Sequence, residues 1–396
     1  MTRAASHARP LITGWGHSVF GKHPETSLAG LIAPVVRDAL DRSGVDPSDI
    51  DEVYLGHFNS GLLPLGFPSS LVLEGEPELW GVPATRVENA CASGSAAVHQ
   101  GLRAIRSGDA RHVLVVGAEK MTHAPAAQVG AALLGADGDV AGHPSTTGFA
   151  GRFAEVAEEY QHRHGPIEDD LARIAAKSHR NAVRNPYAQL RKDLGEEFCG
   201  TVSERNPTVA GILRRTDCSP VSDGAAALVL SAEPSGTAAT EPVVVSGWGQ
   251  ANDFLPAAKR DPLAFAATEL AITRALDRAG VTRAQLDLAE VHDCFTIAEL
   301  ILYELLGLTP RGEGRRAIRE GWVTPDGVLP VNVSGGLKSK GHPVGATGVS
   351  QHVIAAMQLT GTAGEMQLPR AHTALVQNMG GLGIANYASV LTAGTG

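Results

Sequence analysis

The sequence has few cysteines and few aromatic residues, and both shortages exclude whole classes of protein. Its 396 residues contain four cysteines, and no two of them form a Cys-x-x-Cys pair. So few cysteines in so long a chain fit neither a disulfide-rich secreted scaffold nor a zinc module. Aromatic residues make up 5% of the chain, which argues against a surface that stacks nucleic-acid bases.

Long apolar runs and a basic tail are also missing. No uninterrupted apolar segment reaches the roughly 20 residues of a transmembrane helix, and the first residues lack the apolar core of a signal peptide. The formal net charge is −9, which favours neither DNA nor an anionic membrane surface as a partner. We therefore expect a soluble cytoplasmic protein with reduced thiols and with no nucleic-acid or membrane partner.

Two halves of the sequence resemble each other. The tripeptide Gly-Trp-Gly occurs at 14–16 and at 247–249, and Ala-Leu-Asp-Arg occurs at 39–42 and at 275–278. The first pair is 233 residues apart and the second pair 236, so both copies keep nearly the same spacing. Apolar strands follow the helical segments in each copy. A repeated strand–helix unit with continuous apolar strands predicts an α/β protein whose central sheet is covered on both faces.

The region between the two halves has a different character. It combines a glycine-rich stretch at 130–142 with charged helical patterns, one of which covers 168–184. A chain of this length is expected to form more than one domain. The predicted boundaries are 120–215 for an inserted loop or cap domain, 1–119 with 216–238 for the first half, and 239–396 for the second half.

The stretch around Cys91 is the first candidate for chemistry. A short strand at 84–87 leads into the cysteine, and small residues then continue a helical pattern towards Arg106. Cys91 is therefore expected at or near the first turn of a helix. Free N–H groups and the helix dipole favour a thiolate there and lower the pKa of a thiol. The alternative for a lone cysteine is a buried structural residue.

Two later stretches offer partners for a reactive cysteine. The sequence His-Asp-Cys-Phe at 292–295 ends an apolar strand, so Cys294 is either a second reactive thiol or a strand-end cysteine beside a surface histidine. In the glycine-rich stretch 335–348, His342 stands between a glycine and a proline, and this stiff turn sets its orientation. A histidine is the natural base for activating a cysteine. The stretch lacks the Walker pattern of a phosphate-binding loop.

A third stretch, 376–383, is a glycine-rich turn at the end of an apolar strand. It is either an ordinary tight turn or a source of backbone N–H groups for a developing oxyanion.

Together these stretches resemble the thiolase family over essentially the whole chain. That family has an α/β fold of five layers (αβαβα), built from duplicated βαβαβαββ halves with an inserted loop domain. The resemblance therefore implies this fold. The motifs that carry it are ENACASG around Cys91, SPVSDGAAALVL from Ser219, HDCF from His292 and GGLKSKGHPVGATG from Gly335.

One departure from the common thiolase pattern is informative. Common thiolases carry Asn-Glu-Ala-Phe where this chain has HDCF, and a reactive cysteine in a terminal Cys-x-Gly motif. Here the terminal motif reads Asn378-Met379-Gly380, without cysteine. The HDCF form is similar to the sterol-carrier-protein-2 type of thiolase, and by that resemblance Cys294 takes the acid/base role.

The resemblance implies a 3-ketoacyl-CoA thiolase or acetyl-CoA acetyltransferase of lipid metabolism that works through an acyl-cysteine. Coenzyme A is the co-substrate, and no metal or other cofactor is expected. In the implied site Cys91 is the nucleophile, His342 activates it, and His292 stabilises the enolate with His342. The N–H groups of Cys91 and Gly380 hold the oxyanion. Four further residues are assigned to substrate binding: Asn378, Gly341, Ser246 and Met121.

Two other functions stay open, a thiolase-like aldolase acting on a β-hydroxyacyl-CoA and a non-catalytic acyl-CoA-binding scaffold subunit. The two thiols argue against the aldolase, because a simple retro-aldol step needs neither. The expected partners are acyl-CoA, 3-ketoacyl-CoA and CoA, a second copy or a tetramer of the chain, and possibly a small accessory protein. The acyl chain, the reaction direction and the residues that bind the CoA phosphates stay undetermined.

Several other polar residues are expected to have structural or surface roles. They are the arginines at 311, 315, 316 and 319, expected on a solvated face rather than at the CoA phosphates, His162 and His164 at a helix end, and Cys199 and Cys218.

Overall fold

The computed structural model describes residues 9–236 and 238–394. Residues 1–8, 237 and 395–396, which belong to the predicted halves, lie outside the described residues. The first half contains β1 (Leu11–His17), α1 (Leu28–Ser43), β2 (Glu52–Gly56), β3 (Ala84–Val87), α2 (Ser93–Ser107), β4 (His112–Glu119) and, after the insertion, β7 (Gly224–Ser231).

The second half repeats this plan with additional helices. It contains β8 (Val243–Asn252), α7 (Ala266–Ala279), β9 (Leu288–Glu290), α8 (Thr296–Leu305), α9 (Arg315–Arg319), α10 (Gly336–Lys340), α11 (Thr347–Leu359), β10 (Thr373–Gly380) and β11 (Ala385–Ala393). Among the described residues, no helix combines the length and the apolar character needed to cross a membrane.

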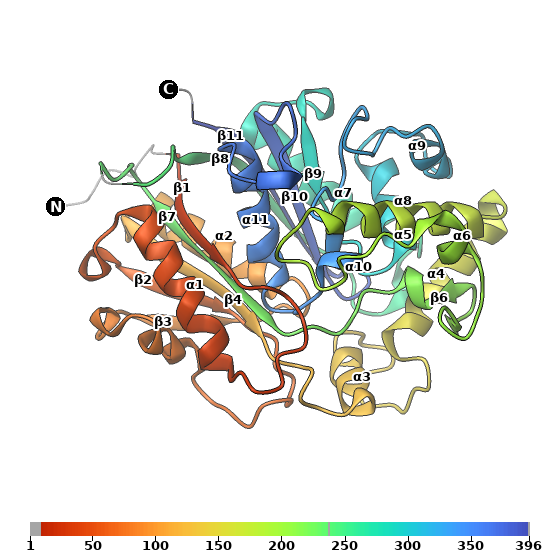
Figure 1. The fold of residues 1–396 in the computed structure, drawn as a ribbon, viewed down its shortest axis with the longest axis horizontal. Coiled ribbons are helices and arrows are strands. Elements are labelled where there is room, and N and C mark those ends of the chain that lie inside the picture. Colours follow the sequence, from red (N-terminus) through yellow and green to blue (C-terminus); the bar gives the residue numbers. More distant parts are fainter. Residues whose placement is uncertain (1–8, 237, 395–396) are drawn as a thin grey trace.

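The sheet strands fall into two groups that enclose a pair of helices. The order β3-β2-β4-β7-β1 is followed by β8-β11-β10-β9, and the groups are joined where β1 pairs with β8 over two residue pairs. Helices α2 and α11 pack against each other between the groups, while α1 and α7 cover the outer faces (Figure 1). This arrangement gives five layers, αβαβα, and confirms the predicted fold class.

The outer helices lie unusually close to their strands, and the repeated glycines allow it. A Cβ atom on Gly14 would meet the carbonyl oxygen of Ala39 in α1 at 2.2 Å. A Cβ atom on Gly247 would meet the carbonyl oxygen of Ala275 in α7 at the same distance. The Gly-Trp-Gly and Ala-Leu-Asp-Arg motifs are therefore the two sides of one helix–strand contact, made once in each half.

The tryptophan of each repeat also meets the arginine of its helix. The Arg42 guanidinium lies 5.1 Å from the Trp15 ring centroid, and the Arg278 guanidinium lies 4.4 Å from that of Trp248. Both distances suit a cation–π contact. The internal repeat predicted from the sequence thus survives as a repeated set of contacts.

The halves differ in detail from a strict βαβαβαββ duplication. Short 3-10 helices, and no α-helix, connect β2 to β3. In the second half, the place of β3 is taken by a single bridge between Ala289 and Val331. The chain between β9 and this bridge forms α8 and α9 instead.

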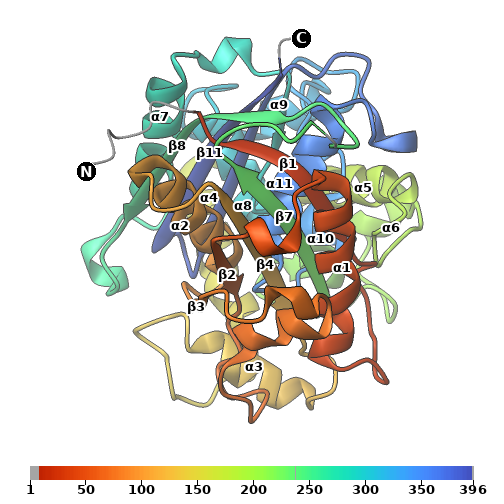
Figure 2. The ribbon, with the colours of Figure 1, turned by 90° about the vertical axis from the view of Figure 1, so that its left-hand side faces the viewer.

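The chain from 120 to 215 forms a helical layer beside the second half. It contains α3 (Ala126–Leu134), α4 (Gly148–His164), α5 (Glu168–Val183), α6 (Gly195–Gly200) and a small hairpin, β5 (Thr208–Ala210) with β6 (Leu213–Arg214). Helices α4 and α5 pack on α8, and α3 lies below the sheet in Figure 2. Whether 120–215 is a separate domain stays a prediction.

Candidate active site

Cys91 lies in a tight turn between β3 and α2. The residue before it, Ala90, has a left-handed backbone with φ of 49°, which costs a residue with a Cβ atom roughly 1 kcal/mol. The Asn89 side chain donates to the Tyr387 hydroxyl at 2.6 Å, and the Asn89 N–H donates to Ser93 Oγ at 2.9 Å. The turn is therefore held from both sides, which fixes the position of the Cys91 side chain.

The structure brings the predicted catalytic side chains together from three parts of the chain. Cys91 Sγ and one ring nitrogen each of His292 and His342 lie within 4.8 Å of one another. The two imidazole rings meet edge to face, with centroids 5.1 Å apart. Burial raises the pKa of Cys294, and the nearby sulfur of Cys91 adds to the rise because the two thiols cannot easily ionise together. The loops after β9 and α10 carry these partners to the turn before α2.

Hydrogen bonds assign the tautomer of His342. Thr347 Oγ1 donates to the Pro343 carbonyl at 3.0 Å and lies 2.7 Å from His342 Nδ1. Because the hydroxyl proton is used on the carbonyl, Oγ1 accepts from Nδ1–H. The other nitrogen of His342, Nε2, is then unprotonated and ready to accept a proton.

His292 has the opposite tautomer. The side-chain amide of Asn378 donates to His292 Nδ1 at 2.8 Å and to the Cys91 carbonyl at 3.2 Å. Nδ1 is therefore an acceptor, and the proton of the neutral ring sits on Nε2. One histidine of the site thus offers a lone pair and the other offers an N–H. Asn378, predicted to bind substrate, touches both His292 and the backbone of Cys91.

Burial keeps all four groups neutral at pH 7. Burial lowers the pKa of His342 to about 4 and that of His292 well below its usual range. Burial also raises the pKa of Cys91 to about 12 and that of Cys294 well above its usual range.

The expectation that a helix N-terminus lowers the pKa of Cys91 is therefore wrong for the free protein. Helix α2 begins at Ser93, so Cys91 precedes its first turn, and loss of solvation outweighs the backbone N–H groups that face the sulfur. The thiolate forms only when a base takes the proton.

The cysteine and the two histidines of the site also match the ligand types of a zinc centre. The hydrogen bonds decide whether the three residues suit metal binding or proton transfer. A metal ligand needs an unprotonated nitrogen, whereas the available nitrogen of His292 carries a proton because Asn378 donates to the other one. The arrangement fits proton transfer and anion stabilisation better than metal binding.

The C-terminal glycine turn lies directly against the Cys91 turn. A Cβ atom on Gly380 would meet the Asn89 carbonyl oxygen at 2.5 Å. Two backbone N–H groups act on the Cys91 sulfur, that of the next residue in the turn, Gly381, and that of Cys91 itself. Gly380, predicted as an oxyanion donor, thus lets the C-terminal turn lie close to the Cys91 turn, and Gly381 provides an N–H to the sulfur.

The other residues predicted to bind substrate have different fates. Met121 packs in an apolar cluster with Cys91, and Gly341 has φ of 117° immediately before His342. The N–H of His342 donates to Ser222 Oγ at 2.9 Å, which helps to hold the histidine. Ser246 lies elsewhere, because it bonds to Thr392 and lines a separate cavity with Trp248 and Arg278.

The residues expected on the surface behave as expected in most cases. Arg311, Arg316 and Arg319 pair with acidic side chains, and Arg315 bonds a backbone carbonyl. His162 lies 3.8 Å from Glu159. Cys199 is buried, whereas Cys218 lines a cavity.

The sequence reasoning missed a buried carboxylate beside the site. Glu119, at the end of β4, accepts hydrogen bonds from the N–H groups of Phe58, Asn59 and Gly345. Burial acts to raise its pKa, but the neighbouring His57, 3.1 Å away, leaves the pKa of Glu119 below its usual value. Glu119 ties the His342 loop to the loop after β2, and no motif around it signals this role.

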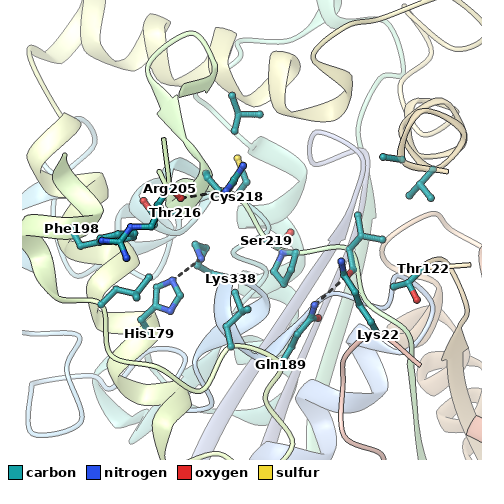
Figure 3. Close-up of a pocket in the computed structure, with 18 of the residues that line it drawn as sticks. Lys22, Thr122, His179, Gln189, Phe198, Arg205, Thr216, Cys218, Ser219 and Lys338 are labelled. Atoms are coloured by element: carbon teal, nitrogen blue, oxygen red, sulfur yellow. Dashed lines mark hydrogen bonds between the residues drawn. The ribbon is translucent and has the colours of Figure 1, made fainter. Parts of the chain in front are cut away.

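A cavity of about 730 Å³ opens beside the site (Figure 3). Its basic residues are Lys22, Arg205, Arg215, Lys338 and His179. Ser219 lines the cavity, and its N–H donates to the carbonyl of Cys294 at 2.9 Å. The cavity wall is thus continuous with the loop that carries the second thiol.

Comparison with known proteins adds the family. Residues 12–197 match the thiolase N-terminal domain, and residues 249–393 match the thiolase C-terminal domain-like family. The chain belongs to the thiolase family.

Two relatives with thiolase-type names match most of the chain. An acetyl-CoA acetyltransferase of Methanothermobacter thermautotrophicus is 35% identical over 94% of this chain and 96% of its own length. The benzoylsuccinyl-CoA thiolase subunit BbsB of Thauera aromatica is 31% identical over 88% of each. The chain also matches 57% of human sterol carrier protein 2, at 32% identity over 76% of this chain.

Solved structures of a thiolase and of an aldolase have the same fold. Human mitochondrial 3-ketoacyl-CoA thiolase in complex with CoA has a TM-score of 0.73 and 18% identity, with 98% of each chain covered. An Ltp2-ChsH2(DUF35) aldolase has a TM-score of 0.80 and 21% identity, with 98% of this chain and 99% of that chain covered. At these identities the likeness shows the fold alone.

Proposed function

We propose that the protein is a thiolase-type acyltransferase, which cleaves a 3-ketoacyl-CoA with CoA or runs the reverse Claisen condensation. One observation carries the proposal. A thiol, Cys91, faces two neutral histidines of opposite tautomer, His342 with a free lone pair and His292 with an N–H. Acyl transfer through a cysteine needs one group to take the thiol proton and another to stabilise a carbonyl oxygen.

In the first half-reaction Cys91 attacks the 3-keto carbonyl. Its proton passes to His342 Nε2 as the new sulfur–carbon bond forms, because neither thiol is ionised at rest. The bond between C2 and C3 then breaks. The acyl group stays on Cys91 as a thioester, and the CoA-bound fragment leaves as an enolate whose oxygen accepts from His292.

Cys294 completes the exchange of protons. As a buried neutral thiol, it protonates the enolate carbon and becomes a thiolate. That thiolate takes the proton of an incoming CoA, whose sulfur attacks the acyl group. Cys91 then leaves as a thiolate and recovers its proton from His342. The covalent intermediate divides one difficult carbon–carbon cleavage into two easier steps.

The surroundings of Cys91 indicate where the two parts of the substrate lie. Apolar side chains of α3 and the neighbouring loops surround the sulfur, and they offer a wall for the acyl chain. They are Phe58, Leu62, Met121, Val129, Leu133 and Val344. On the other side, the exposed cations Lys22, Arg205 and Arg215 stand at the cavity that leads towards Cys294, and we assign them to the phosphates of CoA.

We also propose that two copies of the chain associate. Strand β3 is the edge of the sheet and sits just before Cys91. Near it in the sequence, Phe67 and Trp80 are 88% and 83% exposed, and such apolar exposure is typical of a contact surface. A tetramer and the binding of a small accessory protein are further possible assemblies.

We further propose that the reaction, which needs reduced thiols, takes place in the cytoplasm and uses CoA as co-substrate with no metal or redox cofactor.

Incubation with acetoacetyl-CoA and CoA tests the function. We expect two molecules of acetyl-CoA from each cleavage, and we expect Cys91→Ala to abolish the reaction. Release of a ketone or aldehyde from a β-hydroxyacyl-CoA would support the aldolase instead. Binding of acyl-CoA without any turnover would support the scaffold subunit.

A further inference from the structure

Lys338 is a buried lysine with an unusual environment. It is 1% exposed, and it is one of the residues that line the 730 Å³ cavity. Within the described residues the one hydrogen-bond partner of its Nζ is His179 Nε2, 3.3 Å away, and the two side chains point towards each other (Figure 3). Two of the three donors of the ammonium group therefore remain for something inside the cavity.

The other buried lysines have their own partners. Lys120 pairs with Asp223 at 2.8 Å, and Lys177 pairs with Glu299. Lys340 donates to the Ser350 hydroxyl at 2.8 Å, and the charge of Glu290 favours its protonated form. Among the ion pairs of the described residues, none includes Lys338. Lys340 is absent from those ion pairs too, but it does not line the cavity; the position of Lys338 in the cavity wall distinguishes it from the other three.

The carboxyl groups nearest to Lys338 are already engaged. Asp217 bonds to Arg214 and to the Thr296 hydroxyl. Asp293 accepts from the N–H groups of Leu337 and Lys338, and burial raises its pKa well above the usual range, which makes it a weaker charge partner for the lysine. A buried cation without a paired anion is costly, and a ligand anion in the cavity would remove that cost.

We propose that Lys338, oriented by His179, forms a subsite for an anionic group, a carboxylate or a phosphate, of the substrate that fills this cavity. The inference rests on the proposed function, because it takes the cavity as the acyl-CoA site. The anion has two possible sources, a carboxylate on the acyl chain or a phosphate of CoA. Its oxygens would accept the two remaining N–H bonds of the ammonium group, which are strong because they are charge-assisted.

Ligand binding to the Lys338→Met variant tests this directly. Calorimetry in a Cys91→Ala background, which prevents turnover, compares succinyl-CoA with butyryl-CoA and CoA with pantetheine. If the anion is a carboxylate on the acyl chain, Lys338→Met should weaken the binding of succinyl-CoA by about tenfold or more and that of butyryl-CoA by less than about twofold. If the anion is a phosphate of CoA, the variant should lose the same affinity for every CoA ligand and none for pantetheine.

Two results would overturn the subsite. One is a change of less than about twofold for all four ligands; the other is an equal loss for phosphate-free, uncharged pantetheine. If the unaltered site binds none of the ligands, the proposed function fails as well, which separates the two failures. Lys259→Met, at an exposed lysine that does not line this cavity, is the matched control, and it should leave the affinity for each of the four ligands within about twofold.

Thermal stability supplies a readout that a structural role would not give. A lysine kept to bind ligand should leave the ligand-free protein as stable or more stable when it becomes methionine. Lys177→Met, which breaks a buried ion pair, should lower Tm instead. A large fall in Tm for ligand-free Lys338→Met would count against the subsite. If that variant does not fold, Lys338→Gln carries the same binding comparison.

Discussion

Proton positions on two histidines decide the chemistry of this site. Thr347 and Asn378 each bond the Nδ1 atom of one ring, and they leave the two Nε2 atoms with opposite roles. The side chains of Thr347 and Asn378 act on the histidine rings rather than on the reacting sulfur, and no sequence motif reveals this role. Both act by fixing a tautomer, as the groups behind a catalytic histidine commonly do.

The Thr347 hydroxyl can therefore be tested as a positioning group. Thr347→Val removes the acceptor for Nδ1–H of His342, and we expect kcat to fall by about tenfold to a hundredfold with little change in KM. Thr347→Ser keeps the hydroxyl and should keep most of the activity. An equal loss of activity in both variants, measured by steady-state kinetics, would contradict the assignment.

The pH dependence of the free enzyme follows from the neutral resting state. Burial lowers the pKa of His342 to about 4, and burial raises that of Cys91 to about 12. His342 is a base only above its pKa, so kcat/KM should stay flat between about pH 6 and pH 9 and fall only towards pH 4. A change in kcat/KM with a midpoint near pH 6.5 or pH 8.5, the ordinary pKa values of histidine and cysteine, would contradict this.

The sequence was sufficient to predict which side chains meet, but not their protonation. Motifs name Cys91, His292, Cys294 and His342, and the structure places them together. The roles given to them stay predictions. Their pKa values depend on burial, which requires the packed fold, and for that reason the expected low pKa of Cys91 was wrong. Lys338 lies inside a recognised motif, yet only the structure shows that it lacks an anionic partner.

At the scale of helices and strands, the repeated glycines set the distance between layers. Strand and helix boundaries were predicted closely, for example α2 at Ser93–Ser107 and β3 at Ala84–Val87, because small residues and turn signals mark them. The single bridge that replaces a strand in the second half was not predicted. This bridge depends on how α8 and α9 pack on the inserted helices, and local sequence patterns do not predict that packing.

A glycine substitution tests the close contact between layers. Gly247→Ala would place a Cβ atom 2.2 Å from the Ala275 carbonyl oxygen, so we expect the free energy of unfolding to fall by about 2 kcal/mol or more. Gly130→Ala in α3, where a Cβ atom meets nothing within 4 Å, should instead be neutral or slightly stabilising. Urea unfolding of the two variants makes the comparison, and equal midpoints would contradict it.

At the scale of the whole molecule, buried neutral histidines make the fold sensitive to acid. Burial lowers the pKa of His17 and His179 to about 3 and that of His342 and His352 to about 4. In the unfolded chain these groups take up protons near pH 6.5, so below that pH the unfolded state binds more protons and stability falls.

We expect the free energy of unfolding to decrease between pH 6.5 and about pH 4. Each such histidine contributes up to about 1.4 kcal/mol per pH unit, while His57, whose pKa is raised despite its burial, opposes the trend because of Glu119. Urea midpoints measured at pH 7 and pH 5 check this. A midpoint that stayed constant or rose at pH 5 would show that these histidines are not buried in their neutral form.

The proposed mechanism depends on an acyl-cysteine intermediate, which mass spectrometry of the protein after brief incubation with acetoacetyl-CoA or acetyl-CoA can detect. We expect a mass gain of one acetyl group, located on the peptide that contains Cys91, absent from Cys91→Ala and discharged by added CoA. An acetyl group on another residue, or acetyl-CoA formation by Cys91→Ala, would contradict it.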